Sequence, residues 1–220
     1  MFPRSPVALR EWAVTCDALA RGEQIFVLRG DLRARPDEEA ADGAAEDGEG
    51  PANGPCTGPT PADRASALLH EEFWLWPEWE AQRAADLTGP YRDRKHALDE
   101  LRRRDGRVRL AFYATVEYVE RIGSRERLLA LDGEHVLNAA AVEERLAAAG
   151  EGGLGLLALR VRRIPEAAVV VEEEARAGPG PWIRLPEPVS TGEAEPVVAD
   201  RRFLAEKARI LRLSESLRAV

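Results

Sequence analysis

Apolar residues recur with a period of two in several stretches of the chain, and this alternation predicts β-strands. The most unusual stretch is 71–77, where Trp74 and Trp76 would share one face of a strand while Phe73 and Leu75 share the other. A strand with bulky apolar residues on both faces is either buried on both sides or uses one side as a binding surface. The pattern leaves both interpretations open.

Other short apolar or alternating runs predict further strands. They lie at 24–29, 108–119, 154–164, 167–173 and 182–185, with Pro165 at a turn between two of them.

Helices are predicted where the apolar period lengthens to three or four residues. The first spans 5–21, with Ser5 as its cap and Gly22 as its stop. Further helices are predicted at 78–87, 92–104, 124–131, 139–149 and 200–217.

These elements alternate without a regular strand–helix–strand repeat. We therefore predict one α+β domain over residues 1–220, with a mixed, mostly antiparallel sheet that forms a partly closed barrel with flanking helices. Residues 34–66 interrupt the pattern, because they are rich in Ala, Gly, Pro and acidic residues and nearly free of large apolar ones. We predict that this segment is a disordered acidic insertion.

The net charge of −8 comes from this same stretch. Residues 36–63 hold eight acidic residues and no Lys or Arg, and the 31 acidic residues elsewhere balance the chain's 31 basic ones. The overall acidity is therefore weak evidence against a polyanionic partner, and local clustering of charge decides the question.

The chain has two cysteines, Cys16 and Cys56, and no long apolar run. Because Cys56 lies in the acidic insertion, we do not expect a structural disulfide, and Cys16 is expected to be a buried, inert thiol. We predict a cytoplasmic protein with no membrane partner.

Basic residues cluster in two places, at 92–109 and along the strand that carries Arg160 and Arg162. Arginines beside aromatic rings are what single-stranded nucleic acids use for phosphate contact and base stacking. The alternative is that these arginines form solvated faces and complement helix dipoles.

Catalytic patterns are weak. The three histidines are scattered, so no metal site is expected, although His135 near a helix boundary could act in catalysis. The acids around Glu72 and Glu78 could serve a Mg²⁺-dependent nuclease, but no lysine follows them in the usual arrangement. The glycines in Gly153-Leu154-Gly155 are interpreted as a tight turn rather than a dinucleotide site, because a strand follows them.

The order of several motifs resembles a bacterial family, the domain of unknown function numbered 1802. The motifs are found at 9–12, 18–29, 73–77, 160–161, 182–185 and 196–203. The resemblance implies no established activity. The chain departs from the family pattern at two places. Ala81-Gln82 stands where a His-Gln pair is expected, and residues 178–182 lack the expected cysteine and serine. At the level of fold, the helix, the following strand and the later strand pair are also similar to PUA-like domains, including the ASCH and EVE domains.

We therefore predict a non-catalytic module that binds RNA or DNA, or recognises a modified base, in a restriction or defence context. Its binding residues are predicted to be three tryptophans and four arginines: Trp74, Trp76, Trp182, Arg29, Arg160, Arg162 and Arg184. No catalytic residue, metal or cofactor is assigned. The alternatives are a structural or protein-interaction protein without a nucleic-acid ligand, and the nuclease-like enzyme.

Overall fold

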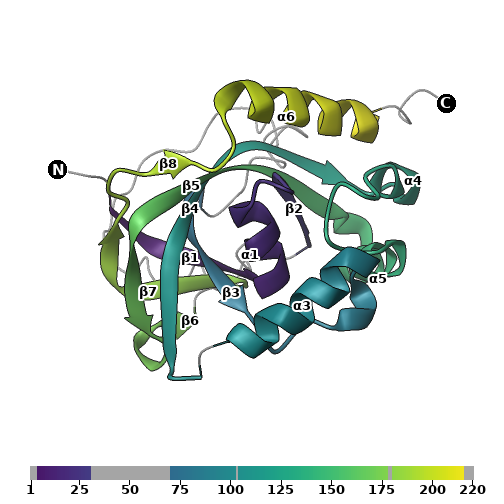
Figure 1. The fold of residues 1–220 in the computed structure, drawn as a ribbon. Helices are drawn as coiled ribbons and strands as arrows, with labels where there is room; N and C mark the ends of the chain where they lie inside the picture. The colour runs from purple at the N-terminus through teal and green to yellow at the C-terminus, as the bar shows by residue number, and fades with distance from the viewer. Residues whose placement is uncertain (1–3, 31–69, 103, 178–179, 216–220) are drawn as a thin grey trace, which may run out of the picture.

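The computed structural model describes residues 4–30, 70–102, 104–177 and 180–215. The predicted disordered insertion at 34–66 and Cys56 lie outside these residues. Eight strands form one sheet (Figure 1). They are β1 (Arg4–Trp12), β2 (Phe26–Arg29), β3 (Glu72–Glu78), β4 (Arg107–Ile122), β5 (Leu154–Val171), β6 (Arg176–Ala177), β7 (Trp182–Ser190) and β8 (Glu195–Pro196).

Seven strands follow the order β2-β5-β4-β3-β1-β7-β6, and β8 pairs with β5 beside this path. Among the strands that the structure describes, only β1 and β3 pair in parallel, and every other pairing is antiparallel. Within the described residues β2 and β6 stay at opposite ends of the path, so the sheet curves without closing. The predicted α+β class and the mostly antiparallel, partly closed sheet are confirmed.

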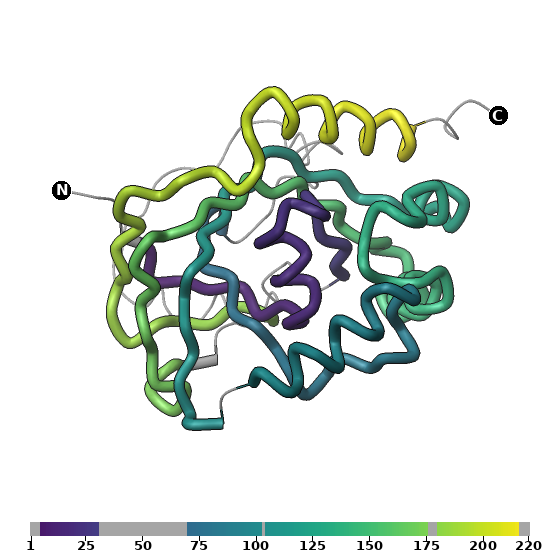
Figure 2. The backbone as a smooth tube through the Cα atoms, viewed as in Figure 1, coloured from purple at the N-terminus to yellow at the C-terminus, as the bar shows by residue number. Residues whose placement is uncertain are grey.

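One helix lies at the centre of the molecule, beside the curved sheet, and the others lie around it (Figure 2). They are α1 (Ala13–Ala20), α3 (Gly89–Leu101), α4 (Arg125–Leu129), α5 (Ala139–Ala149) and α6 (Asp200–Glu215). Helix α1 lies in the middle of the molecule, while α3, α4, α5 and α6 lie around it (Figure 2). Every residue of α1 except Asp17 is buried, so this short helix is a central part of the core.

The first predicted helix is corrected at its N-terminal half, because residues 4–12 form strand β1. This strand lies between β3 and β7. Two consecutive residues of the strand, Ala8 and Leu9, are fully buried on its opposite faces. Ser5 does not cap a helix, because its hydroxyl contacts the backbone of Val7. Backbone pairing on both edges outweighs the local helical spacing of Leu9 and Trp12.

Two other predicted boundaries differ. Residues 78–87 contain only a 3₁₀ turn at Ala84–Asp86. The predicted turn at Pro165 lies inside the continuous strand β5, where Phe112 pairs with Arg163 and Leu110 pairs with Ala168. The extra β5 residues between these pairs form a bulge, which accommodates a proline that has no N–H to donate.

The glycine turn before β5 is confirmed. Gly153 has a φ of +62°, and a Cβ atom there would lie 2.7 Å from the Ile122 carbonyl oxygen. A side chain at this position would therefore clash with the backbone as well as strain it.

Strand β3 is buried on both faces. Phe73 and Leu75 pack in a cluster with Leu9, Leu157 and Trp182, and the opposite face packs in a second cluster. The second cluster contains Trp74, Trp76, Leu110, Tyr113, Ile183 and Leu185. The first of the two interpretations of the aromatic strand is therefore the right one.

Candidate functional site: a polar pocket beside the central helix

The predicted binding tryptophans lie in the core. Trp74 is 0% exposed, Trp76 3% and Trp182 2%, so none of these rings presents a face on which a base could stack. Edge-to-face contacts hold two of them against other rings, Trp74 against Tyr113 and Trp182 against Phe73. This corrects the expected stacking surface. The large apolar side chains of β3 point alternately to the two faces of the strand, and both faces are covered.

The four predicted arginines are dispersed. Arg160 lies beneath α6, where its Nη1 atom is 2.9 Å from the Asp200 carboxylate and its guanidinium carbon is 3.9 Å from the centre of the Phe203 ring. Arg162 pairs with Pro196 of β8 in the sheet, and Arg184 is exposed on β7. Arg29 lines a pocket and the other three lie on separate parts of the described sheet, so the structure does not gather the four arginines into one surface.

Part of the basic stretch at 92–109 is engaged in ion pairs. Arg94 pairs with Glu23 and Asp17, Lys95 with Asp99, and Arg102 with Glu80. Exposed pairs of this kind contribute little to stability, and they also reduce the attraction of this surface for polyanions.

The acids of the nuclease alternative are also engaged separately. Glu72 accepts a hydrogen bond of 2.6 Å from the Tyr113 hydroxyl, and Glu78 lies 3.5 Å from Arg10. Across the described ranges, no three His, Cys, Asp or Glu residues converge in a way that could hold a metal ion.

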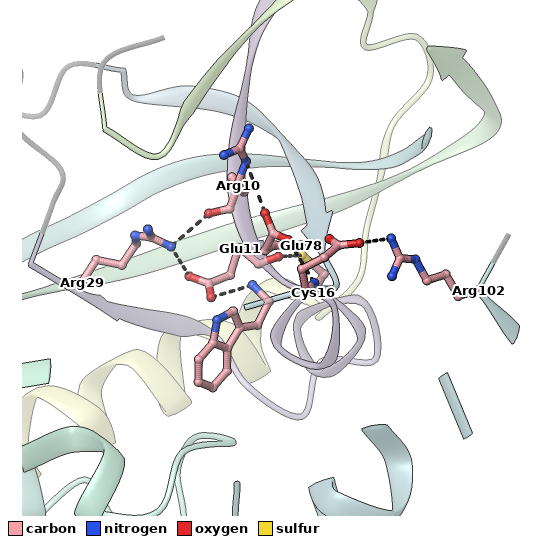
Figure 3. Close-up of polar contacts among 8 residues, drawn as sticks. Arg10, Glu11, Cys16, Arg29, Glu78 and Arg102 are labelled. Carbon is pink, nitrogen blue, oxygen red and sulfur yellow. Dashed lines mark hydrogen bonds and ion pairs between the residues drawn. The ribbon is translucent and has the colours of Figure 1, made fainter. Parts of the chain in front are cut away.

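A different set of polar residues does converge, where β1 meets α1. Glu11 is the second-last residue of β1 and is only 2% exposed. One of its carboxylate oxygens accepts a hydrogen bond of 2.9 Å from Arg29 at the end of β2, and the other accepts one of 2.8 Å from the Trp12 N–H. Arg29 also donates to the Arg10 carbonyl at 3.0 Å, so a buried carboxylate and a backbone oxygen fix its guanidinium (Figure 3).

Trp12 and Arg145 complete the outer part of this cluster. The Arg145 guanidinium carbon, from α5, lies 4.4 Å from the centre of the half-buried Trp12 ring. Its Nη1 atom donates to the Leu28 carbonyl at 3.1 Å. This geometry is a cation–π stack, in which the planar guanidinium lies over the indole.

These side chains line a pocket of about 420 Å³, which we call the Trp12 pocket. Its described lining consists of Trp12, Leu28, Arg29, Gly30, Arg145, Ala148 and Ala149. The volume falls in the range of roughly 300–1,000 Å³ that is usual for small-molecule sites. An indole, two guanidiniums and small apolar side chains suit a planar ligand that carries negative charge.

The inner side of the cluster is also polar. Thr15 and Gln24 are buried, and His135 is 4% exposed with its ring packed edge-to-face against Phe26. Burial is the main cause that lowers the pKa of His135 to about 4, so its ring is neutral at neutral pH. From the sequence, His135 was a candidate for catalysis with no neighbouring site residues. In the structure it lines the same small cavity as Glu11.

Two further residues have structural roles here. Cys16 is buried as expected, and its thiol pKa is raised first by burial and then by the nearby Glu11 carboxylate. Gln82 stands where the family pattern pairs it with a histidine, and its side-chain oxygen accepts a hydrogen bond of 3.2 Å from the Val14 N–H at the start of α1. Trp12, at the cap position of α1, makes no side-chain capping bond, so Gln82 satisfies this helix from a distant part of the chain.

Sequence reasoning missed Glu11, Trp12 and Arg145 as site residues. The available signals were a carboxylate at a position expected to be helical and a tryptophan without an aromatic neighbour, and neither pattern points to a pocket.

The fold and the pocket define an α+β protein with a partly closed sheet and a polar pocket beside a buried central helix. The chain belongs to the family described as Domain of unknown function (DUF1802), whose model matches residues 61–209. The predicted family resemblance is confirmed, although β1, α1 and β2 precede the matched range. No curated protein and no solved structure matches the chain. The helices of the described residues are too short or too polar to cross a membrane.

Proposed function

We propose that this protein is a non-catalytic nucleic-acid-binding module that holds one nucleotide in the Trp12 pocket. The observation that carries the proposal is the Trp12–Arg145 stack beside Arg29, which the buried Glu11 carboxylate holds in place. Bases stack on aromatic rings and on guanidinium planes, and guanidiniums contact phosphate oxygens. The pocket supplies both kinds of group, the Trp12 ring and the guanidiniums of Arg29 and Arg145.

The charge of the pocket favours an anionic ligand. Glu11 and Arg29 offset each other, since their side chains are only 2% and 15% exposed and their charged atoms are 2.9 Å apart. Arg145 adds a further positive charge at the pocket wall. A half-buried indole stacked with one guanidinium and close to a second suits a phosphate-bearing base better than a neutral apolar ligand.

The PUA-like relationship and a restriction or defence context remain predictions. Both are compatible with a module that recognises a base, and neither is needed for the argument from the pocket. A cytoplasmic location also remains a prediction.

The test is a titration of the full chain with short single-stranded RNA and DNA. Binding is monitored by tryptophan fluorescence at two salt concentrations. We expect saturable quenching and weaker binding at higher salt, because phosphate contacts release counterions. Trp12→Leu should weaken binding by roughly 10-fold, since base stacking contributes about 1–3 kcal/mol.

Trp79→Leu is the matched control. Trp79 is also half-buried, and Arg102 lies 5.6 Å from its ring centre, yet it belongs to a different hollow of about 390 Å³. We expect this variant to bind as the unaltered chain does. Absence of saturable binding, or a loss of binding in Trp79→Leu instead of Trp12→Leu, would overturn the proposal.

A further inference from the structure

A second, smaller cavity lies directly behind the Trp12 pocket. It has a volume of about 10 Å³, which is room for one water-sized group. Leu28 and Arg145 line both hollows. Arg145 therefore forms part of the wall between them, and a shift of its flexible side chain would join the two.

His135 is an anomaly in the wall of this cavity. His135 is only 4% exposed, and neither ring nitrogen meets the geometry of a hydrogen bond with any residue that the structure describes, although the Leu137 backbone lies close enough to raise the pKa of the ring. Buried polar atoms without partners are rare, because they have lost their bonds to water and gained none in return. A hydrogen-bonding group supplied by a ligand would provide the partner that the His135 ring nitrogens lack.

The cavity is richer in acceptors than in donors. The Glu11 carboxylate keeps acceptor capacity beyond its two bonds, the Thr15 hydroxyl can accept or donate, and a neutral imidazole accepts at one nitrogen. Gln24 is already committed, because its oxygen accepts from the Val136 N–H at 3.0 Å and its nitrogen donates to the Phe26 carbonyl at 2.5 Å. A small group with N–H donors matches these partners.

We propose that this cavity, which we call the amino pocket, receives the exocyclic amino group of a base held in the Trp12 pocket. The protein then prefers adenine and cytosine, which carry that group, to hypoxanthine and uracil, which carry an oxygen instead. This inference rests on the proposed function. The oxygen of hypoxanthine would face the Glu11 carboxylate and repel it where an amino group would donate to it, and sites built to bond a donor reject analogues that lack it.

The entry of the amino group requires the Arg145 guanidinium to move away from the mouth of the amino pocket. Arg145 is held there by the Leu28 carbonyl and the Trp12 ring, so the proposal requires its guanidinium to shift along the indole face while it stays stacked on it. The base then lies against the guanidinium plane, with its amino group directed at His135.

The experiment compares AMP with IMP on the full chain by isothermal titration calorimetry. The two nucleotides differ only in the amino group and the oxygen at one ring position. We expect AMP to bind at least 10-fold more tightly than IMP. Histidine ring ¹⁵N chemical shifts provide a second readout, since the His135 nitrogens should move on addition of AMP and stay in place with IMP.

Two variants locate the effect. In His135→Phe the preference for AMP over IMP should fall to less than 3-fold, while the affinity for IMP stays unchanged. Thr15→Val preserves the side-chain shape, and it provides the same comparison if the histidine variant fails to fold.

The outcomes separate the two proposals. Equal binding of AMP and IMP, with the His135 nitrogens unmoved, overturns the amino pocket and leaves the proposed function standing. Absence of binding by either nucleotide or by single-stranded RNA and DNA overturns both proposals. A preference for AMP that persists in both variants also overturns the amino pocket.

Discussion

His135 lies in an environment that differs strongly from water. Its ordinary pKa of 6.5 falls to about 4 in the fold, chiefly because burial penalises the charged ring. Arg145 reinforces this shift, while Asp132, Glu134 and the Leu137 carbonyl oppose it. The net effect keeps the ring neutral over the whole range in which an unfolded histidine becomes protonated.

This shift predicts an acid-sensitive contribution to stability. Between pH 6.5 and about 4 the unfolded chain binds a proton that the native chain does not, so the free energy of unfolding falls as the pH falls through this window. At about 1.4 kcal/mol for each pH unit, the loss is roughly 3 kcal/mol. Urea unfolding at several pH values, in the unaltered chain and in His135→Phe, measures it as the difference between the two curves.

The variant His96→Gln is the control for this experiment, because His96 is exposed on α3. Its stability should follow that of the unaltered chain at every pH. Parallel pH curves for His135→Phe and the unaltered chain would contradict the prediction.

Among helices and strands, α6 depends on a buried ion pair for its position. Arg127 of α4 lies 2.6 Å from Glu120 of β4 and donates a second bond of 2.5 Å to the Ser214 carbonyl near the end of α6. The two charged side chains are 11% and 7% exposed. One guanidinium thus joins three elements, which explains how α6 stays on the outer side of the sheet (Figure 1).

We expect Arg127→Met to destabilise the protein by about 3–5 kcal/mol, because it leaves the Glu120 carboxylate buried without this partner. The double variant Arg127→Met/Glu120→Met should recover much of this loss, since neither charge is then buried. Chemical denaturation followed by circular dichroism measures both values.

The neighbouring residue supplies a matched control. Arg125 also lies on α4 and pairs with Glu143 at 2.5 Å, but the two side chains are 56% and 41% exposed. Arg125→Met should cost less than about 1 kcal/mol. Equal losses in the Arg125 and Arg127 variants would show that burial does not distinguish the two pairs.

The whole molecule is organised around the N-terminal strand and helix. β1 is hydrogen-bonded between β3 and β7, and α1 fills the space enclosed by the other elements (Figure 2). Both lie outside the range matched by the family model, which begins at residue 61. The matched range therefore does not coincide with the unit that folds.

A fragment of residues 61–209 should accordingly lack a cooperative unfolding transition. It loses β1 and α1, whose buried residues belong to three core clusters, and total stabilities are only about 5–15 kcal/mol. Co-expression of residues 1–60 with residues 61–220, which keep the whole of α6, should restore a folded complex. A fragment that melts cooperatively on its own, near the temperature of the full chain, would contradict this prediction.

The elements with the clearest periods were predictable from the sequence. β3, β4 and α5 were placed within a few residues because their apolar residues alternate or recur without competing signals. The α+β class and the antiparallel majority followed from the irregular order of short strands and helices. The burial of β3 on both faces was one of two interpretations that the pattern allowed.

The first twenty residues show why the remainder was not predictable. Leu9 and Trp12 fit a helix by spacing, but β3 and β7 are distant in the chain and offer hydrogen bonds to both edges of residues 4–12. A local period contains no information about partners that arrive from 60 or 180 residues away. Only the assembled sheet could decide between strand and helix.

The candidate site depends on the same kind of information. In the sequence, the polar residues of the site are common residue types without a distinctive motif around them; they are Glu11, Arg29, His135 and Arg145. The conspicuous pattern is formed by Trp74 and Trp76. That pattern determined a strand with large apolar side chains on both faces, and the tertiary structure decided that both faces are covered, because burial removes this apolar surface from water. The pocket arose where the ends of β1 and β2 meet α5, since only tertiary packing brings those four polar side chains within reach of one another.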